Sequence, residues 1–364
     1  MKIAIDAINV KSDGGLTYLN EFLINLDKRD INKIFIFINN KSLIKIKDKK
    51  FDIIENPIFE KNFLLTNLWK FFFLNSYLKK NNCKKLIVMS GHYIGNFNPT
   101  FLVMQNALPF AKKITKKFPL VFRIKFIIQK LSHILSIYKK NNVIFVSNYI
   151  KTEVLKNFSK KIKYVVSHHA GSNKIAIRKK NKIIKEKKLK LIYVSQYNYH
   201  KNHINLIYAI HEINKNKIRV TLDCFGEDIN DNFIRIKNII KTNKIKGVLL
   251  KKSIDQEKLF KIYKDYDCHI FPSYCESFGL SLLEAAKAGL LIMCSNLKSF
   301  EELLKKSAIY FNPNSKDHIK IALLKVINLK KSEFDKKITK SIQHSKKYIW
   351  KLEIEKIKKF MLKI

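Results

Sequence analysis

Short apolar runs alternate with longer segments of helical periodicity along the chain, and this alternation constrains the fold more than any other feature of the sequence. Short apolar runs bounded by polar residues are typical of buried strands, whereas apolar residues at i, i+3, i+4 and i+7 are typical of helices. Leu19, Phe22, Leu23 and Leu26 follow the helical spacing soon after the first run. Because strands that alternate with helices form parallel sheets, the sequence predicts an α/β fold.

The predicted strands fall into two groups, each large enough for its own doubly wound parallel sheet. The groups are 2–6, 34–38, 86–89, 101–104, 143–147 and 164–167, then 191–195, 219–225, 248–250, 269–271 and 290–294. We therefore predict two Rossmann-like domains, residues 1–172 and 191–345, joined by a basic linker at 173–190. The amphipathic segment 346–364 is predicted to be a final helix that packs back on one domain, which we take to be the first.

The charge balance raises the question of a polyanionic partner. The 364 residues include 72 Lys and Arg against 29 Asp and Glu, a net charge of +43. However, only five of these cations are arginine, the residue on which base readout relies. Enrichment in Lys, Ile and Asn together is what an A+T-rich genome produces. We interpret the charge as compositional and expect no nucleic-acid partner; selection for polyanion binding is the open alternative.

Cysteine usage and the terminal sequence indicate a compartment. Five cysteines, with no spacing typical of zinc sites or disulfide frameworks, favour a reducing cytosol. The first residues lack the apolar core of a signal peptide. The longest apolar stretch, 63–78, is interrupted by polar residues and is shorter than the roughly 20 apolar residues that a membrane span needs. We expect a cytoplasmic protein without a transmembrane helix.

A glycine pair follows the first predicted strand. Gly14 and Gly15 precede the helix that carries Leu19 and Phe22. A turn of this kind lets backbone N–H groups approach an anion at a helix N-terminus. A purely structural glycine turn is the alternative, because the third glycine of the dinucleotide fingerprint is missing.

A more specific motif begins at the end of the strand 269–271. Residues 271–289 read Phe-Pro-Ser-Tyr-Cys-Glu-Ser-Phe-Gly-Leu-Ser-Leu-Leu-Glu-Ala-Ala-Lys-Ala-Gly. Glu276 lies in a loop at the carboxyl end of the strand, where α/β sheets bind ligands, and Glu284 lies in the following helix. Carboxylates so placed can accept hydrogen bonds from sugar or ribose hydroxyls. Phe278-Gly279-Leu280 bring backbone N–H groups and a helix dipole that suit a diphosphate.

These residues resemble a known family: the glycosyltransferases of the GT-B fold, and among them the large family-four class of retaining enzymes, the group 1 glycosyl transferases. The resemblance rests on Pro272-Ser273, Glu276, Phe278-Gly279-Leu280, Leu283-Glu284-Ala285 and Ala288-Gly289. Weaker matches cover most of the second half, among them Lys201-Asn202 and Phe225-Gly226-Glu227. The first half matches at Gly14-Gly15, 106–110 and Val146-Ser147.

The resemblance implies transfer of a sugar from a nucleotide-diphosphate sugar to a saccharide or lipid-linked acceptor, with retention and without a metal or other cofactor. Such a reaction would serve cell-surface polysaccharide or lipopolysaccharide synthesis. It implies that Glu276 holds sugar hydroxyls, Glu284 the ribose hydroxyls and Lys201 the diphosphate. The implied donor site is Gly14, Gly15, Gln196, Lys201, Glu276, Ser277, Phe278, Gly279, Leu280 and Glu284.

Two positions depart from the family pattern. Many relatives carry an arginine where this chain has Gln196, and His200 could replace that cation only when protonated. We expect His200 to be a neutral surface residue. Many relatives also have a histidine after the fourth strand of the first domain, where this chain has Gln105 and Asn106, which we assign to the acceptor side. His92 is then the nearest catalytic candidate, with a plain loop histidine as the alternative.

Two short patterns imitate metal sites. Asp265-Tyr266-Asp267 matches the Asp-x-Asp pattern by which another glycosyltransferase fold holds a divalent metal, but it ends a helix and leads into a strand. We interpret it as structural. His168 and His169 are adjacent at a strand end and therefore point to opposite faces, with His169 expected to line the interdomain cleft. We predict no metal site.

Two segments mix aromatic residues with lysines or apolar residues, at 63–78 and 110–140. Either could rest on an anionic membrane surface, which would make the protein peripheral to the inner face of the cell membrane. An ordinary buried helix with a lysine-rich polar face is the alternative for 110–140. For the whole chain, the alternatives to glycosyl transfer are a sugar-nucleotide epimerase or other GT-B enzyme, and a non-enzymatic binder of nucleic acid or membrane.

Overall fold

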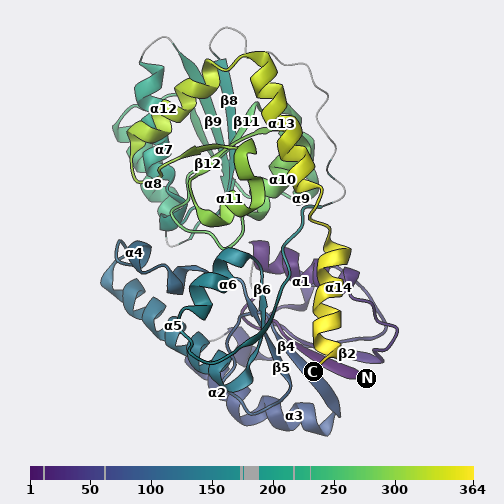
Figure 1. The fold of residues 1–364 in the computed structure, drawn as a ribbon. Coiled ribbons are helices and arrows are strands. Elements are labelled where there is room, and N and C mark those ends of the chain that lie inside the picture. The colour runs from purple at the N-terminus through teal and green to yellow at the C-terminus, as the bar shows by residue number, and fades with distance from the viewer. Residues whose placement is uncertain (11–12, 61–62, 173–174, 176–187, 216–217, 230) are drawn as a thin grey trace. The chain divides into compact units, whose positions relative to one another are not determined.

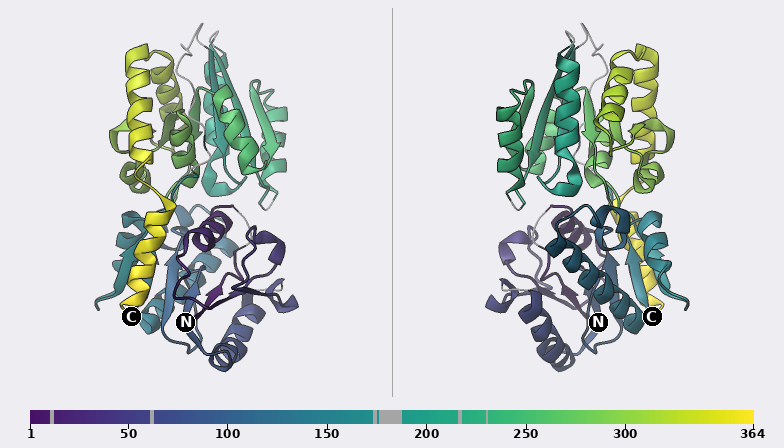
Figure 2. Two further views of the ribbon diagram at one scale, coloured as in Figure 1. Left: turned by 90° about the vertical axis from the view of Figure 1, so that its right-hand side faces the viewer. Right: turned by 90° about the vertical axis from the view of Figure 1, so that its left-hand side faces the viewer.

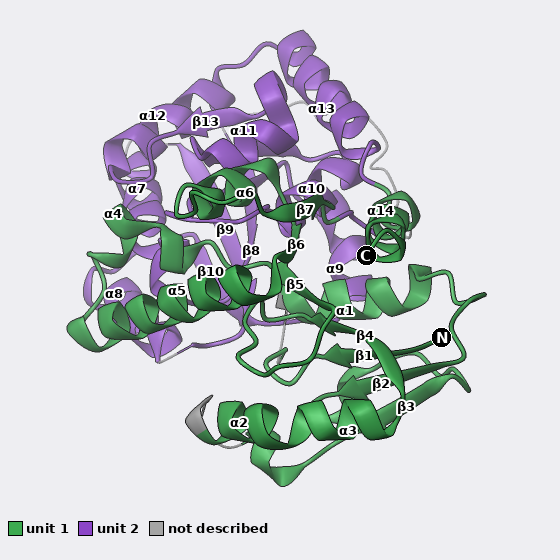
Figure 3. Ribbon diagram, turned by 60° about the horizontal axis from the view of Figure 1, so that its bottom comes forward, with its two compact units in different colours: residues 1–169, 349–364 green, residues 170–348 purple. Residues whose placement is uncertain are grey.

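The computed structural model describes residues 1–364 except 11–12, 61–62, 173–174, 176–187, 216–217 and 230 (Figure 1). The chain divides into two compact units, which Figure 3 distinguishes by colour. Unit 1 comprises residues 1–169 and 349–364, and unit 2 comprises 170–348. Each unit is built on a parallel β-sheet with helices packed on it (Figure 2). The prediction of two doubly wound α/β domains is confirmed.

The sheet of unit 1 has seven strands in the order β3-β2-β1-β4-β5-β6-β7, all paired in parallel. The strands are β1 (Lys2–Asp6), β2 (Lys33–Phe37), β3 (Phe51–Ile54), β4 (Cys83–Val88), β5 (Thr100–Met104), β6 (Asn142–Phe145) and β7 (Lys163–Val166). The order reverses between β1 and β4, and the crevice outside the carboxyl ends of these two strands is where such a sheet binds ligands.

Helices lie between most consecutive strands of unit 1, while β2 and β3 are joined through a 3₁₀ turn and β4 is followed by β5 without a helix. The helices are α1 (Asp13–Asn25), α2 (Phe63–Trp69), α3 (Asn75–Lys80), α4 (Lys112–Thr115), α5 (Leu120–Lys140), α6 (Asn148–Leu155) and the C-terminal α14 (Trp350–Leu362), with a π-helical turn η3 (Lys70–Leu74) and short 3₁₀ turns η1 (Lys41–Leu43), η2 (Pro57–Glu60) and η4 (Leu108–Phe110). The periodic residues Leu19, Phe22, Leu23 and Leu26 are all buried on α1, as predicted.

The sheet of unit 2 has six strands in the order β10-β9-β8-β11-β12-β13, again all parallel. The strands are β8 (Lys188–Val194), β9 (Arg219–Gly226), β10 (Val248–Lys252), β11 (Cys268–Phe271), β12 (Leu291–Ser295) and β13 (Ile309–Phe311). The helices are α7 (His203–Asn214), α8 (Asn232–Thr242), α9 (Gln256–Ile262), α10 (Leu280–Ala288), α11 (Lys298–Leu304), α12 (Lys316–Ile327) and α13 (Lys331–Ser345), with 3₁₀ turns η5 (Tyr199–Lys201), η6 (Tyr263–Asp265) and η7 (Lys305–Ser307).

All eleven predicted strands are present within a few residues, and two further strands were not predicted. β3 is a half-buried edge strand among lysines, and β13 has three residues, so neither has the long apolar run of a central strand. The predicted linker also needs a correction, because its residues 188–190 belong to β8. Leu189 is buried between exposed Lys188 and Lys190, and that alternation is a strand pattern with a basic outer face. Apart from Ile175, the rest of the predicted linker lies outside the described residues.

The C-terminal helix α14 belongs to unit 1, where it packs on α1 and β7. Ser167 Oγ donates to the Glu353 carbonyl at 2.9 Å, and the His168 N–H donates to Glu353 Oε2 at 2.9 Å. His169 is buried and stacks on Tyr18, with ring centroids 5.0 Å apart. Burial lowers the pKa of His169 to about 3. The expectation that His169 lines a cleft is therefore wrong: its ring is a neutral part of the core.

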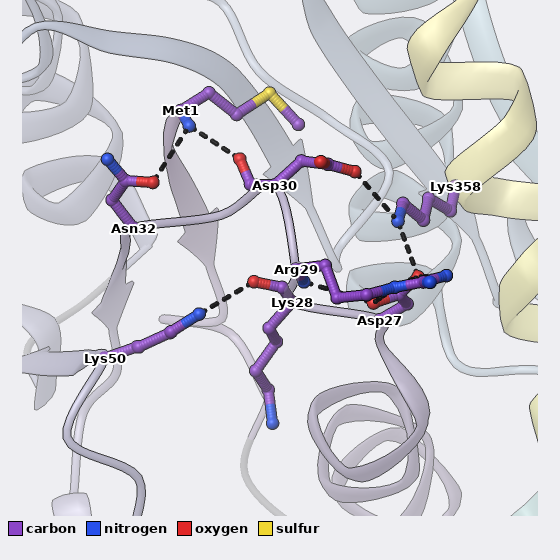
Figure 4. Close-up of polar contacts among 8 residues, drawn as sticks. All are labelled: Met1, Asp27, Lys28, Arg29, Asp30, Asn32, Lys50 and Lys358. Atoms are coloured by element: carbon purple, nitrogen blue, oxygen red, sulfur yellow. Dashed lines mark hydrogen bonds and ion pairs between the residues drawn. The ribbon is translucent and has the colours of Figure 1, made fainter.

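A cluster of charges secures the far end of α14 (Figure 4). Lys358 Nζ lies 2.8 Å from Asp27 Oδ2 and 3.3 Å from Asp30 Oδ2, just beyond the end of α1. Arg29 also binds Asp27, at 2.7 Å, and the chain's N-terminal amine donates to the Asp30 carbonyl. Both chain termini are thus tied to the same turn of unit 1.

The segments that suggested a membrane surface form several helical elements. Residues 63–78 are divided among α2, η3 and the start of α3, and residues 110–140 among the end of η4, α4 and α5. No helix in the described parts of the chain is both long and apolar enough to cross a bilayer.

Candidate functional site

In unit 2 the strand order reverses between β8 and β11, so ligands are expected outside the carboxyl ends of these two strands. The segment after β8 forms η5 and then α7, and the segment after β11, residues 272–279, leads into α10. These are the two segments to which the sequence assigns Lys201 and Glu276. The predicted motif therefore lies at the edge where a doubly wound sheet binds its ligand.

Lys201 and Glu276 form an ion pair at this edge. Lys201 Nζ lies 2.6 Å from Glu276 Oε1, and the two side chains are 15% and 14% exposed. The ammonium also lies 5.3 Å from the centre of the Phe271 ring, within cation–π range. Because the pair is partly solvated, a ligand can replace one partner with its own groups. Lys201 can bind an anion, and Glu276 can accept hydrogen bonds from hydroxyls.

Hydrogen bonds to backbone carbonyls hold the two segments together. Asn202 Nδ2, in the side chain, donates to the carbonyls of Pro272, at 3.0 Å, and Pro313, at 2.7 Å. Asn202 itself has φ +57°, a left-handed conformation that asparagine tolerates. The Tyr274 N–H donates to the His200 carbonyl at 2.8 Å. Lys201 and Glu276 are therefore carried by segments whose relative position is fixed before any ligand binds.

Glu284 faces a different neighbour. It is 5% exposed on α10, and its Oε1 accepts a hydrogen bond of 2.6 Å from Gln256 Nε2 at the start of α9. Lys287, one helical turn further, donates to the Gly171 carbonyl at 2.7 Å. A carboxylate whose partner is a neutral amide can exchange that hydrogen bond for one from a hydroxyl at little electrostatic cost. The predicted ribose role of Glu284 thus requires Gln256 to give way.

The N-terminus of α10 supplies backbone donors. Gly279 has φ +110° and occupies the N-cap, so the first N–H groups of the nine-residue helix are left without intrahelical acceptors. A Cβ at Gly279 would lie 2.9 Å from the Phe300 ring. Phe278 is buried against Tyr348, with ring centroids 5.6 Å apart, whereas Ser277 and Leu280 are partly exposed. Of these residues, Phe278 packs in the core of unit 2, and the N–H groups at the start of α10 are those that can bind an anion.

Gln196 lies where β8 ends, beside a close approach of two backbones. A Cβ at Gly226, the last residue of β9, would come 1.9 Å from the Ser195 carbonyl oxygen, so only glycine fits. His200 follows on η5, but the expectation of a surface histidine is wrong, because it is buried. Burial, with further contributions from Lys201 and His203, holds the pKa of His200 well below its usual value. His200 therefore cannot supply the cation that Gln196 lacks.

In unit 1 the predicted glycines lie within a helix. Gly14 and Gly15 form part of the first turn of α1, rather than a turn before it. A Cβ at Gly14 would meet nothing within 4 Å, and one at Gly15 would meet Val10 at 3.7 Å. Neither glycine is therefore required by packing among the described residues. The helix follows β1, at the binding edge of its sheet.

His92 lies in the segment after β4, also at the switch point of unit 1, but it is buried. It is 8% exposed, its Nδ1 lies 3.3 Å from the Ser90 carbonyl oxygen, and its ring meets the His133 ring edge-on at 5.6 Å. Burial, reinforced by Lys70 and His133, lowers the pKa of His92 to about 3. At neutral pH the ring is uncharged and could act only through a neutral nitrogen.

Gln105 and Asn106 follow β5 and serve the local backbone. Gln105 Nε2 donates to the Met89 carbonyl at 3.1 Å, which links the segments after β5 and β4. Asn106 Oδ1 accepts from the Leu108 N–H at 3.1 Å and so starts the 3₁₀ turn η4. Asn106 remains exposed.

An ion pair in unit 1 was not predicted from the sequence. Lys70 Nζ lies 2.7 Å from Asp6 Oδ2, and neither side chain is exposed. Asp6 ends β1, and Lys70 begins the π-helical turn η3, a distortion that is frequent at functional sites. The sequence signal was a lysine among apolar residues at 63–78, which we interpreted only as an interruption of that stretch.

Asp265-Tyr266-Asp267 has structural contacts. Asp267 Oδ2 accepts from the Lys190 N–H at 2.9 Å, and the Asp267 N–H donates to the Lys190 carbonyl, so the residue fixes β8 beside β11. Tyr266 donates to Asp223 Oδ2 at 2.6 Å. In the parts of the chain that the structure describes, no group of three or more His, Cys, Asp or Glu side chains is arranged to hold a metal ion.

Comparison with known families and proteins agrees with this geometry. Residues 173–345 match the family Glycosyl transferases group 1. A segment of 71 residues is 32% identical to O-antigen chain mannosyltransferase B from Escherichia coli. That match spans 20% of this chain and about a fifth (19%) of the relative's length.

Solved structures show the same two-domain fold at low sequence identity. The sucrose-phosphate synthase of Thermosynechococcus elongatus superposes with a TM-score of 0.79 at 13% identity, over 100% of this chain and 98% of the other. HepE from Anabaena, in complex with UDP and glucose, gives 0.75 at 12% identity over 100% of both chains. WaaG, a glycosyltransferase involved in lipopolysaccharide biosynthesis, gives 0.74 at 12% identity over 98% of both. This chain therefore has the GT-B fold, and its residues 173–345 are similar to the group 1 glycosyl transferases.

Proposed function

We propose that the protein transfers a sugar from a nucleotide-diphosphate sugar to a saccharide or lipid-linked acceptor in the synthesis of a cell-surface polysaccharide or lipopolysaccharide. The observation that carries this proposal is the Lys201–Glu276 pair, which lies at the switch point of the sheet and inside the family match. The similarity to an O-antigen mannosyltransferase and the fold of WaaG support the class of acceptor.

The proposed donor site divides the work among the residues of unit 2. Lys201 binds the diphosphate and stabilises it as it leaves, together with the N–H groups at the start of α10. Glu276, released from Lys201, accepts hydrogen bonds from sugar hydroxyls. Glu284 exchanges Gln256 for the ribose hydroxyls. Ser277 and Gln196 line the same edge, and Gly279 lets the chain enter α10.

From unit 1 we propose that Gly14 and Gly15 offer the first N–H groups of α1 to the diphosphate. His92 is proposed to act near the reacting sugar through a neutral nitrogen, and Gln105 and Asn106 to lie on the acceptor side. We further propose that the reaction retains the anomeric configuration and needs no metal, and that the enzyme works in the cytoplasm at the inner face of the cell membrane.

The test is a thermal-shift panel of UDP, GDP, ADP, CMP and common nucleotide sugars with three proteins: wild type, Glu284→Ala and Glu212→Ala. Glu212 lies near the far end of α7, paired with Lys316, and serves as the matched control. At about 100 times its Kd, one nucleotide should stabilise the wild type by about 2–3 kcal/mol. We expect the control to respond equally and Glu284→Ala to lose most of the shift.

Other outcomes separate the alternatives. An equal response from Glu284→Ala would remove Glu284 from the site. Turnover of the nucleotide sugar without any acceptor would indicate an epimerase. No nucleotide response, with DNA binding that falls steeply with salt, would indicate a polyanion binder. Once a donor is known, activity should persist in EDTA, and NMR of the product should show the anomeric configuration of the donor; the opposite results would overturn the metal-independent and retaining parts of the proposal.

A further inference from the structure

The longest helix of unit 1, α5, turns most of its large apolar side chains outward, and three of its five buried residues are polar, the reverse of the usual arrangement. Eight of its large apolar side chains are between 50% and 76% exposed: Leu120, Val121, Ile124, Ile127, Ile128, Leu131, Leu135 and Tyr138. Its buried residues are Phe126, His133, Ser136, Ile137 and Lys140. The exposed residues recur at spacings of three, four and seven, so they form one continuous stripe along the 21-residue helix.

The segment α2–η3 has the same reversed arrangement. Leu65, Leu68, Phe71, Phe72 and Phe73 are between 41% and 61% exposed, whereas Thr66, Asn67 and Lys70 are buried together with Leu74. Scattered exposed apolar residues are normal, but two helical segments of one domain that both turn their apolar side outward are not. We call the exposed residues of α5 and of α2–η3 together the apolar face (Figure 3 shows both segments in unit 1).

The buried polar side chains of α5 contact backbone groups of the segment after β4. His133 Nδ1 lies 3.0 Å from the Gly91 carbonyl oxygen, Ser136 Oγ accepts from the Tyr93 N–H at 2.9 Å, and Lys140 Nζ donates to the Phe97 carbonyl at 3.0 Å. On the other segment, Lys70 binds Asp6. Among the described residues of unit 1, no such contacts cover the exposed apolar side chains, whose exposure costs free energy in water.

Charge indicates what covers the apolar face. Residues 61–152, which include both segments, contain 16 Lys and Arg and not one Asp or Glu. The cations at and beside α5 are largely exposed, namely Lys112, Lys113, Lys116, Lys117, Arg123, Lys125 and Lys139. A second copy of this chain would bring like charges together, and nucleic acid offers no apolar surface to bury the aliphatic stripe. An anionic lipid bilayer offers both an apolar layer and negative headgroups.

We propose that the apolar face of unit 1 binds the surface of an anionic bilayer. The aliphatic and aromatic side chains enter the boundary between headgroups and acyl chains, and the flanking lysines contact the anionic headgroups. Only one part of this depends on the proposed function, namely that the enzyme meets its acceptor at the membrane. The segment that carries His92, which the buried polar residues of α5 contact, then lies beside the headgroup layer.

The experiment is flotation of the full chain with phosphatidylcholine vesicles that contain or lack phosphatidylglycerol, at low and at high salt. Wild type should bind the anionic vesicles and bind the neutral ones at least about tenfold more weakly. The triple substitution Ile124→Ser, Leu131→Ser and Leu135→Ser should reduce binding at least about tenfold. All three side chains belong to the apolar face and are at least half exposed there. Ile234→Ser with Ile321→Ser, equally exposed in unit 2, is the matched control.

A second pair of variants tests the charge. A quadruple Lys→Gln substitution at Lys112, Lys113, Lys116 and Lys117 should lower binding to the anionic vesicles at least about tenfold. The same quadruple substitution at Lys330, Lys331, Lys336 and Lys340 of unit 2 should not. Equal losses in the two would show unspecific attraction and overturn the proposal, as would wild type that stays unbound to every vesicle. A wild-type dimer in ultracentrifugation that the apolar triple variant converts to monomer would overturn it in favour of self-association. Nucleotide-induced thermal shifts of all variants should equal those of wild type, so failure here is distinguishable from failure of the proposed function.

Discussion

The binding edges of the two sheets carry ion pairs of nearly equal length in opposite surroundings. Lys201 and Glu276 of unit 2 are 2.6 Å apart and partly exposed, whereas Lys70 and Asp6 of unit 1 are 2.7 Å apart and fully buried. A partly solvated pair can be opened by a ligand, because water and ligand groups replace the lost partner. A buried pair cannot be opened without leaving an unpaired charge in the interior. We therefore expect a ligand to open the first pair and interpret the second as structural.

The histidines at the two edges, in contrast, are alike. His92 at the edge of unit 1 and His200 at the edge of unit 2 are both buried, and burial lowers the pKa of each. Neither carries charge near neutral pH. Among the described residues, neither histidine can therefore supply positive charge to a ligand near neutral pH.

The largest expected effect is on stability, from Lys70→Met. The substitution leaves Asp6 buried without its cation, which should lower the free energy of unfolding by about 3–5 kcal/mol. Lys33→Met is the matched control, because Lys33 forms a 2.8 Å pair with Asp52 that is about 40% exposed, and its loss should cost less than about 1 kcal/mol. Urea denaturation measures both. Equal stabilities of the two variants would contradict a structural role, and Asp6→Asn added to Lys70→Met should restore part of the loss.

Next in size is the effect of Lys201→Met on turnover. If Lys201 stabilises the departing diphosphate, turnover should fall by about 10²–10³-fold, the loss typical of one donor to a developing charge. The fold should be little affected, since Glu276 remains in contact with solvent. Lys251→Met is the control: Lys251 pairs with Asp223 at 2.7 Å elsewhere in unit 2, and turnover should stay near that of wild type. Near-normal turnover of Lys201→Met would place the cation of the reaction elsewhere.

The sequence predicts the strands because each is an apolar run. It predicts Glu276 because it belongs to the dense motif at 271–289, and Lys201 only through the weaker part of the family resemblance. It does not predict the Lys70–Asp6 pair, whose residues are 64 positions apart and belong to no local pattern. Nor does helical periodicity tell which side of α5 is buried, since an apolar stripe has the same spacing whether it faces the core or the outside. The lysine-rich start of β8 was assigned to the linker for a similar reason: its basic outer face hid the alternation of Leu189 and Leu191.

A third prediction concerns acid stability and compares core with surface histidines of unit 2. His269 on β11 is fully buried, neither ring nitrogen has a hydrogen-bond partner among the described residues, and burial lowers its pKa to about 3. The unfolded chain binds a proton below about pH 6.5, whereas the folded chain does so only near pH 3. Above pH 6.5 this histidine therefore does not lower the free energy of unfolding. As pH falls toward 3 the free energy of unfolding decreases, by about 1.4 kcal/mol at pH 5.5.

His269→Leu removes that term, so the free energy of unfolding should fall less between pH 7.5 and pH 5.5 than in wild type, by about 1.4 kcal/mol. The same change at His318, which is exposed on α12, is the surface control. Urea denaturation at the two pH values gives the comparison. A His269→Leu profile parallel to that of wild type would mean that the buried ring can bind a proton in the folded state.

The smallest expected effect concerns two glycines, one at each binding edge. It distinguishes a glycine that contacts a ligand from one that packing requires. A Cβ at Gly14 meets nothing within 4 Å, so Gly14→Ala should keep or raise the free energy of unfolding, by about 0.5–1 kcal/mol in a helix. A Cβ at Gly226 would lie 1.9 Å from the Ser195 carbonyl oxygen, so Gly226→Ala must shift the backbone and should destabilise unit 2. If the N-terminus of α1 meets the diphosphate, Gly14→Ala should bind the nucleotide sugar more weakly in calorimetry although its fold is intact. Wild-type affinity in that stable variant would instead make Gly14 an ordinary residue of the first helical turn, and unit 2 alone would then account for the binding of the diphosphate.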